Sequence, residues 1–293
     1  MGSHRGVESA DQVPGKGAHQ PQSGSDCGGE RDWQVLSAQD FYTGVADYMR
    51  RVDPSWDEEN WRAQVADELR GLRAVMGEAN GRSVLDCSCG SGGQAIPLAK
   101  LGWQVKAADI TAAYLDIARR RAKQEDVSIV FRRCDMRHLD RYFQASFDWV
   151  VSCMALDNIT ADEQIQQAVK GMFGALRPGG RCYIRLRDFD HIMDVKPRYD
   201  FKEERAVPQG RVIRLEDWAY ESDTHVLNIY VFLREDERKT DWPWVTDVFS
   251  YRRRALRKAE LEQFLRGAGF QEVEFLPQPS PWHPHEVVAS KAT

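Results

Sequence analysis

Apolar side chains recur at helical intervals in the first part of the chain that has a clear pattern. Ser37 is placed to cap a helix. The apolar side chains that follow it at helical spacing are Phe41, Tyr42, Val45, Tyr48, Met49 and Val52. A second helix is predicted at about residues 57–76, with one apolar side formed by Trp61, Val65, Leu69, Leu72 and Val75. The pattern therefore predicts helices ahead of the first strand.

From residue 83 onward, short apolar runs alternate with helical patterns. The runs predicted as strands are SVLDCS, WQVKAADI, SIVFRRCDM, FDWVVSCMAL and RCYIRLRDF. The helical patterns are GGQAIPLAKLG, AAYLDIARRRAKQ and ADEQIQQAVKGMFGAL. Strands joined through helices favour right-handed crossovers and a parallel sheet, with ligands at the carboxyl ends of its strands. The helix KAELEQFLRGAGF and the strands QEVEFL and EVVASK then add an antiparallel pair. We expect an α/β fold with a Rossmann-like seven-stranded sheet and helices on both faces.

Four parts of the chain are expected. Residues 1–31 are rich in Gly, Ser, Gln and charge, and such a segment is expected to be disordered or extended. Residues 32–80 supply N-terminal helices that cover the active site, and residues 81–187 with 251–293 form the sheet domain. Residues 188–250 contain RVIRLEDWAY and HVLNIYVFL, which read as antiparallel strands of an inserted β lid.

Composition narrows the function classes. The 293 residues are 42% hydrophobic with a formal net charge of −5, so no global field favours nucleic acid or an anionic membrane surface. The basic runs RHLDR and YRRRALRK are interpreted as solvated helix faces. No apolar stretch approaches the roughly 20 residues of a membrane span, and no signal-peptide pattern opens the chain, which predicts a cytoplasmic protein.

Six cysteines form no CxxC pair and no His/Cys cluster at zinc-ligand spacing, so no metal site is predicted. We interpret them as reduced, small hydrophobic side chains. A thiol-based chemistry, such as methylation of a soft metalloid, is the alternative.

The segment SVLDCSCGSGGQA carries the candidate chemistry. Gly90, Gly92 and Ala95 satisfy GxGxx(G/A), so a dinucleotide must be considered. Asp86, however, would repel a diphosphate, and further acids follow the next two strands at Asp109 and Asp135. S-adenosylmethionine (SAM) fits this pattern better: glycines allow close approach, Asp109 can accept from its ribose hydroxyls, Asp135 can accept from its adenine amino group, and carboxylates favour its sulfonium. Helix capping and surface exposure are the alternative roles of these acids.

The motifs VLDCSCGSGG, AADI, RCDM and LRPGGRCYI, followed by AGF and a closing strand, resemble class I SAM-dependent methyltransferases over Ser37 to Thr293. The resemblance implies SAM as cofactor and S-adenosyl-L-homocysteine as product. The predicted cofactor contacts are Asp86, Gly90, Gly92, Asp109, Ile110, Asp135, Met136 and Cys153, with Ile110 and Met136 beside the adenine.

Two further segments, FYTGVADYMRRVDPSW and RLRDFDHI, are similar to glycine and glycine/sarcosine N-methyltransferases. The resemblance implies that Arg187 binds a substrate carboxylate, which a planar guanidinium can do in bidentate fashion. A structural pair with Asp188 or Asp190 is the alternative. Those enzymes carry Gly-Asn-Ser where this chain has CMALDN, with Asp157 and Asn158 slightly displaced. The acidic residue there could instead meet an ammonium or guanidinium group of a larger amine.

A SAM-dependent N-methyltransferase acting on a small amine or amino acid is therefore the predicted function. Asp157 or a tyrosine would take the proton of the amine, with His283 as the alternative base. The predicted substrate-binding residues are Arg187 and the aromatics Tyr42, Tyr48, Tyr199, Trp218 and Tyr220, each of which could equally be core. The alternatives are an O- or C-methyltransferase, a non-catalytic SAM-binding scaffold and an NAD-dependent oxidoreductase. No nucleic-acid or membrane partner is expected, and homo-oligomerisation is left open.

Overall fold

The computed structural model describes residues 34–52, 61–207, 210–235, 244–280 and 282–293. The chain divides into two units, Met1–Trp33 and Gln34–Thr293, and all described residues belong to the second. The expected disorder of residues 1–31 and the start of the helix predicted at 57–76 lie outside the described residues. No helix in the described ranges is both long and apolar enough to cross a membrane.

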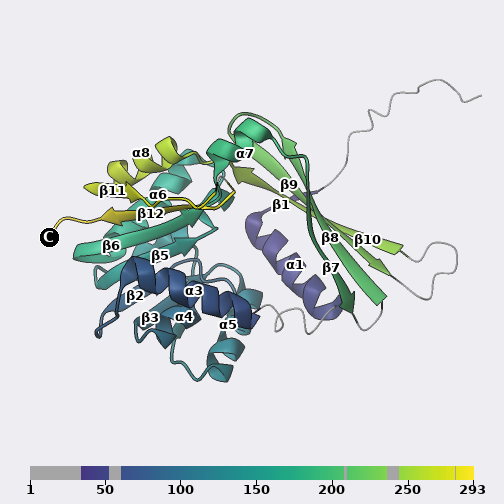
Figure 1. The fold of residues 1–293 in the computed structure, drawn as a ribbon. Coiled ribbons are helices and arrows are strands. Elements are labelled where there is room, and N and C mark those ends of the chain that lie inside the picture. Colours follow the sequence, from purple (N-terminus) through teal and green to yellow (C-terminus); the bar gives the residue numbers. More distant parts are fainter. Residues whose placement is uncertain (1–33, 53–60, 208–209, 236–243, 281) are drawn as a thin grey trace, which may run out of the picture. The chain divides into compact units, whose positions relative to one another are not determined.

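Seven strands form one sheet in the order β11-β12-β6-β5-β2-β3-β4 (Figure 1). They are β2 (Ser83–Asp86), β3 (Gln104–Asp109), β4 (Val130–Arg133), β5 (Phe147–Cys153), β6 (Leu176–Leu186), β11 (Glu272–Phe275) and β12 (His285–Ser290). The first five pair in parallel, whereas β12 pairs antiparallel with both β6 and β11. The predicted sheet and its antiparallel pair are confirmed, and the strand order reverses between β2 and β5, where α/β sheets bind ligands.

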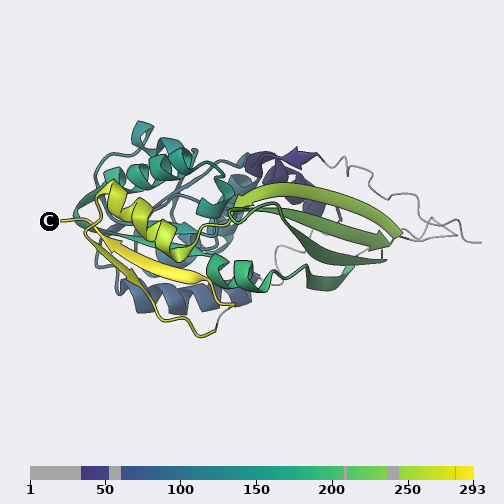
Figure 2. The same cartoon turned by 90° about the horizontal axis from the view of Figure 1, so that it is seen from above.

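Helices cover both faces of this sheet (Figure 2). On one face are α3 (Trp61–Met76), α4 (Ala95–Lys100) and α5 (Ala112–Gln124), whose apolar side chains pack with those of β2 and β3. On the other face are α6 (Asp162–Ala175) and α8 (Lys258–Ala268), which pack on β5, β6 and β12. Short turns of helix, η1 (Met136–Arg141) and η2 (Leu156–Asn158), follow β4 and β5 and carry loop residues to the carboxyl edge.

A second sheet of five strands has the order β1-β10-β9-β8-β7. Its strands are β1 (Val35–Leu36), β7 (Tyr199–Val207), β8 (Gly210–Tyr220), β9 (His225–Glu235) and β10 (Trp244–Arg254), and α7 (Phe189–Val195) precedes β7. The long strands pair antiparallel, and β1 runs parallel to β10. The strands predicted from RVIRLEDWAY and HVLNIYVFL correspond to β8 and β9, and β10 extends four residues beyond Ser250.

Helix α1 (Ala38–Val52) packs on one face of the five-stranded sheet through Phe41, Val45 and Tyr48. The predicted cap is present, because the hydroxyl of Ser37 accepts a hydrogen bond from the amide of Asp40 (3.1 Å). This helix lies alongside the sheet in Figure 1 and carries its first turn toward the carboxyl edge of β2 and β3.

The interpretation of YRRRALRK as a solvated helix face was wrong. Tyr251–Arg254 ends β10, and Arg253 and Arg254 are buried. Burial is tolerated because each guanidinium has carboxylate partners, Asp157 for Arg253 and Glu260 with Asp162 for Arg254. The other basic run, RHLDR, falls in η1.

Candidate active site

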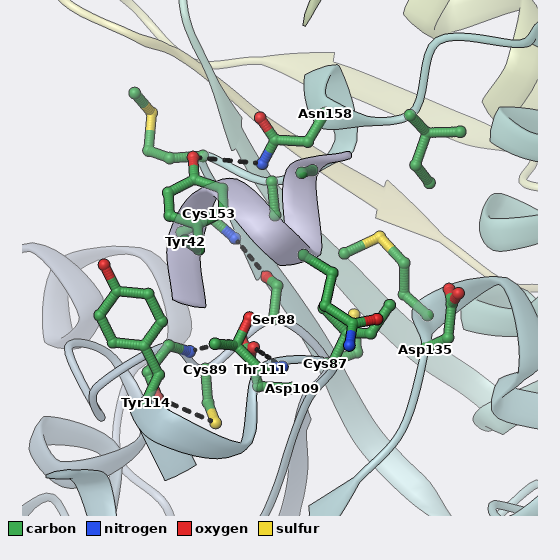
Figure 3. Close-up of a pocket in the computed structure, with 18 of the residues that line it drawn as sticks. Tyr42, Cys87, Ser88, Cys89, Asp109, Thr111, Tyr114, Asp135, Cys153 and Asn158 are labelled. Carbon is green, nitrogen blue, oxygen red and sulfur yellow. Dashed lines mark hydrogen bonds between the residues drawn. The ribbon is translucent and has the colours of Figure 1, made fainter. Parts of the chain in front are cut away.

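A cavity of about 920 Å³ lies at the carboxyl ends of the parallel strands (Figure 3). Its walls come from the loops after β2, β3, β4 and β5, from the end of β6 and from the first turn of α1. This volume is typical of sites that enclose small molecules. The cavity therefore occupies the place at which the fold would bind a ligand.

The glycine loop after β2 forms the floor of the cavity. Gly90 lines it with φ at +49°, and no atom lies within 4 Å of the position that a Cβ would occupy. Gly92 does not line the cavity; its φ is +97°, and a Cβ there would lie 2.8 Å from Cδ1 of Ile96. Gly90 thus leaves room beside the cavity, whereas Gly92 allows the turn into α4.

Asp109, at the end of β3, is fixed at the cavity wall by two backbone hydrogen bonds. The amide of Gly90 donates to Oδ2 and the amide of Thr111 donates to Oδ1, both at 2.8 Å. Burial raises the pKa of Asp109 despite these bonds. Each carboxylate oxygen keeps a further lone pair, so Asp109 can accept from a pair of hydroxyl groups.

Asp135, after β4, also lines the cavity, next to Met136. Nε of Arg137 donates to both of its carboxylate oxygens, at 3.0 and 2.9 Å. Burial raises the pKa of Asp135, but the hydrogen bonds and charge of Arg137 outweigh it, so the pKa lies below its ordinary value. Asp135 is therefore an ionised acceptor, and Ile110 lines the cavity as an apolar neighbour.

Asp86 lies behind the loop and does not line the cavity. Its side chain is fully buried, and Oδ1 accepts from the amide of Ser88 at 3.3 Å. Oδ2 meets no donor at hydrogen-bond geometry within the described ranges. Burial, together with the negative charges of Asp109 and Glu68, raises the pKa of Asp86 to about 7.

Four cysteines border the cavity, namely Cys87, Cys89, Cys134 and Cys153. Burial raises the pKa of each thiol above its ordinary value. A neutral thiol is a poor nucleophile and a poor metal ligand. The geometry favours the interpretation of these residues as small hydrophobic side chains, with Cys153 as part of the wall.

Arg187, at the end of β6, lines the cavity from the other side. Its Nη1 donates to Oδ2 of Asp157 at 3.0 Å, and Nη1 of Arg253 donates to the same oxygen at 2.8 Å. The predicted alternative partners Asp188 and Asp190 instead lie beside His285, with carboxylate oxygens 3.1 and 3.4 Å from its Nε2. Burial raises the pKa of Asp157, but the two guanidiniums outweigh it and hold the pKa below its ordinary range. Asp157 is thus an ionised anchor for two arginines, and it does not line the cavity.

Hydrogen bonds continue from Arg253 to the cavity wall. Nη1 of Arg253 also donates to Oδ1 of Asn158 (3.2 Å), and Nδ2 of Asn158 donates to the hydroxyl of Tyr42 (3.4 Å). The Tyr42 and Tyr251 hydroxyls are 3.1 Å apart. Figure 3 shows Tyr42 and Asn158 together on one side of the cavity, opposite Ser88 and Cys89 of the loop after β2 and Asp109 at the end of β3. The polar network joins α1, η2, β6 and β10 at this wall.

Of the five aromatics predicted to bind substrate, Tyr42 lines the cavity and the other four do not. Tyr48 is buried between Phe232 and Phe249, with ring centroids 4.7 and 5.8 Å away. Tyr199 is 71% exposed at the edge of the sheet.

Trp218, Tyr220 and His283 also lie away from the cavity. The indole N–H of Trp218 donates to Glu216 (3.2 Å), and the Tyr220 hydroxyl donates to the carbonyl of Pro197 (2.8 Å). The amide of His283 donates to the carbonyl of Ser280 (3.0 Å) in the loop before β12. Among the described residues, these three are therefore not part of the cavity wall.

Several wall residues were not predicted from the sequence. Tyr114 on α5 lies 6.0 Å from the Tyr42 ring, and Trp61 on α3 stacks under the guanidinium of Arg121 at 3.8 Å. Arg253, behind the wall, was also missed. The alternation of β10 places Arg253 on the same face as Tyr251. Three consecutive arginines, however, do not show the alternation of apolar and polar residues that would indicate a strand.

Comparison with known proteins agrees with this geometry. Residues 84–180 match the family described as "Methyltransferase domain". The glycine/sarcosine N-methyltransferase of Parasynechococcus marenigrum (strain WH8102) is 25% identical over 151 residues, which are 50% of this chain and 53% of that protein. The ubiquinone biosynthesis O-methyltransferase of Coxiella burnetii (strain RSA 493 / Nine Mile phase I) is 31% identical over 104 residues, 36% of this chain and 43% of that protein. The chain thus spans about half the length of the curated relatives it matches.

Among solved structures, the SAM-bound amino pentose methyltransferase from Micromonospora echinaspora superposes with a TM-score of 0.62 at 18% identity. The superposition covers 88% of this chain and 99% of that one. The match over residues 84–180 and the superposition agree on the fold, which is the Rossmann-like fold of that SAM-bound methyltransferase.

Proposed function

We propose that this chain binds SAM at the carboxyl edge of the seven-stranded sheet and transfers its methyl group to the nitrogen of a small amine or amino acid. The observation that carries the proposal is one cavity that joins the fixed carboxylate of Asp109 to the guanidinium of Arg187. Its volume of about 920 Å³ is large enough for a nucleoside cofactor and a small acceptor together.

The cofactor contacts follow from the wall residues. The methionine part of SAM would lie over Gly90 and beside Cys153, the ribose hydroxyls would donate to Asp109, and the adenine amino group would donate to Asp135. Ile110 and Met136 would contact the adenine ring. Asp86, one layer behind the loop, has a pKa of about 7, so the cationic end of a bound cofactor would favour its ionised form.

Arg187 is the proposed site for an anionic group of the acceptor, such as a carboxylate. Asp157 neutralises one of the two guanidiniums it binds, so the Arg187–Asp157–Arg253 cluster keeps one net positive charge. A carboxylate could therefore pair with Arg187 in bidentate fashion without meeting an opposing negative charge.

Methyl transfer forms a carbon–nitrogen bond while the carbon–sulfur bond breaks, and its electron pair goes to sulfur. The amine must arrive neutral and gives up a proton after the transfer. Asp157 is a poor acceptor for that proton because two arginines lower its pKa. The Tyr42 hydroxyl is therefore the proposed contact of the nitrogen, and the proton of the methylated ammonium would pass to solvent. Holding nitrogen, carbon and sulfur in line can supply about 7–11 kcal/mol of the barrier reduction.

The test is a mass-spectrometric assay with methyl-labelled SAM and a panel of amino acids, amines and phenols, beside calorimetric SAM binding on the same sample. Label on nitrogen is the expected result. Label on oxygen or carbon would change the proposed acceptor atom, and the proposal of a methyltransferase would stand. SAM binding without any labelled product would favour a non-catalytic scaffold, and displacement of SAM by NAD would contradict the cofactor assignment.

A further inference from the structure

The strand β9 is apolar on both of its faces. Its sequence HVLNIYVFL runs through Val226 to Leu233 with one polar interruption, Asn228. Strands with one face in water normally alternate apolar and polar residues, whereas strands covered on both faces read as continuous apolar runs. The composition of β9 therefore calls for cover on both faces of the five-stranded sheet.

Strand register assigns the side chains of this sheet to two faces. Phe232 pairs with Arg214 and Asp247, and this face packs on α1 through Val212, Phe232 and Tyr251. The opposite face, here the outer face, carries one row that crosses all four long strands: Phe201, Leu215, Val231 and Val248. The next row adds Ile213 and Leu233, which are direct partners. The outer face thus presents a continuous apolar centre.

This apolar centre has no partner in the part of the chain that the structure describes. None of its six residues belongs to a hydrophobic cluster formed by the described residues. The ends of the first row are well exposed, with Phe201 at 60% and Val248 at 40%. Exposed apolar patches rimmed by charge mark protein interfaces.

The rim carries both signs of charge. At one end of the outer face Arg211 pairs with Glu204 and Glu235, which leaves a small negative excess. At the other end Asp217 pairs with Arg198. An anionic lipid surface would need a basic rim, so the charge pattern favours a protein partner over a membrane.

We propose that the outer face binds the outer face of a second copy of this chain. Residues 1–31 are nearly devoid of large apolar side chains, so their composition suits them poorly as cover. Four strands of about 10 residues span roughly 600 Å² at sheet spacings. Ile229 and Ser250 on this face are already buried, so two copies would bury less than about 1,200 Å² in total, which fits a weak, concentration-dependent dimer. A two-fold pairing covers the same apolar row in both copies at once and requires no other chain.

The test is the solution mass of the full chain by analytical ultracentrifugation over a wide concentration range. Wild type is expected at twice the chain mass of 33.5 kDa. Val248→Lys and Phe201→Lys, on different strands, should each halve the mass because lysine would be buried unpaired at the interface. Val130→Lys is the matched control, because Val130 is an exposed strand valine (62%) of the other sheet. This variant should remain a dimer.

Thermal melting of each variant checks that it is folded, and both outer-face positions are exposed enough that lysine should not disturb the monomer. A monomeric wild type would overturn the proposal, as would dimers that survive both outer-face substitutions. If wild type is a monomer that co-sediments with phosphatidylcholine vesicles, and Val248→Lys abolishes this co-sedimentation, the outer face is a lipid contact. That result would also overturn the proposal.

Discussion

Two buried carboxylates near the cavity, Asp109 and Asp157, show how neighbours decide the role of a residue. Burial raises the pKa of Asp109, whose donors are backbone amides. Two arginines reverse this effect at Asp157 and lower its pKa. The sequence located both acids, but it could not locate the partners that make one a ligand acceptor and the other an anchor.

Replacement of Asp109 by alanine is expected to weaken SAM binding about 10–100-fold, because hydrogen bonds to charged groups contribute about 1.5–3 kcal/mol. Isothermal titration calorimetry measures the change. Asp116→Ala, on an exposed part of the following helix α5, is the control and should keep wild-type affinity. Unchanged affinity of Asp109→Ala with a normal melting curve would exclude the proposed ribose contact.

Arg187→Gln is expected to raise the KM of a carboxylate-bearing acceptor about 10–100-fold while leaving SAM affinity unchanged, since a charged bidentate contact is lost. Steady-state kinetics with a matched pair of acceptors, one with and one without the carboxylate, measures this. The acceptor without the carboxylate should lose little. Equal losses for both acceptors, or a parallel loss of SAM binding, would point to structural damage instead.

At the level of elements, the sequence predicted strands well where burial is continuous and poorly where charge interrupts it. The parallel strands were predicted because their apolar runs are flanked by glycine and helical patterns. β7 (YDFKEERAV) and β10 (WVTDVFSYRRR) were not, because charged residues mask the apolar alternation. Arg253 is buried only because its partner Asp157 lies 96 positions away in the chain, and local pattern carries no such information.

Strand β10 offers neighbouring arginines for a test of this burial. Arg253→Met is expected to lower the free energy of unfolding by about 3–5 kcal/mol, since it breaks a buried pair. Arg252→Met, one residue earlier and 42% exposed beside Glu221, should change it by less than about 1 kcal/mol. Urea unfolding followed by circular dichroism measures both.

The double variant Asp157→Asn/Arg253→Met separates charge from packing. If the cost arises from unbalanced charge, the double variant should be less destabilised than the sum of its single variants, and the difference is the coupling energy. Strict additivity, or equal effects of Arg252→Met and Arg253→Met, would contradict a buried charge network at this position.

On the scale of the whole described unit, the candidate site depends on both sheets. The seven-stranded sheet supplies the glycine loop and the acids. Its parallel part was predictable because helices separate those strands, and its antiparallel pair because a short connection joins the last two strands. Tertiary packing places the side chains that α1 brings to the cavity, and it also places Arg253 of β10 behind them. This explains why most of the residues predicted to contact the cofactor line the cavity, whereas Tyr48, Tyr199, Trp218 and Tyr220 do not.

The stability of the unit should depend on pH through Asp86. Its pKa is about 7 when folded against 3.8 as the ordinary value, so between these values the folded state keeps a proton that the unfolded state has lost. The free energy of unfolding from this group therefore falls as pH rises from about 4 to about 7, and it is level above. Asp86→Asn removes this slope.

Urea unfolding of wild type and Asp86→Asn across this range measures the effect. The stability of the variant relative to wild type should increase with pH by up to about 4 kcal/mol, given 1.36 kcal/mol for each unit of pKa difference. Asp148→Asn is a useful comparison, because the pKa of Asp148 lies below its ordinary value. Its contribution changes only below about pH 4, so the stability difference between this variant and wild type should be flat across this range. A difference that does not change with pH would exclude a raised pKa at Asp86.

The single oxygen of Asp157 that binds both arginines imposes an order on biosynthesis. Asp157 and Arg187 emerge from the ribosome early, and with only these two the cluster is electrically neutral. The net positive charge that would attract an anionic acceptor appears only when Arg253, 66 residues after Arg187, docks on the same oxygen. Chain elongation therefore supplies the positive charge of this wall last, because Arg253 is synthesised after every residue proposed to contact SAM.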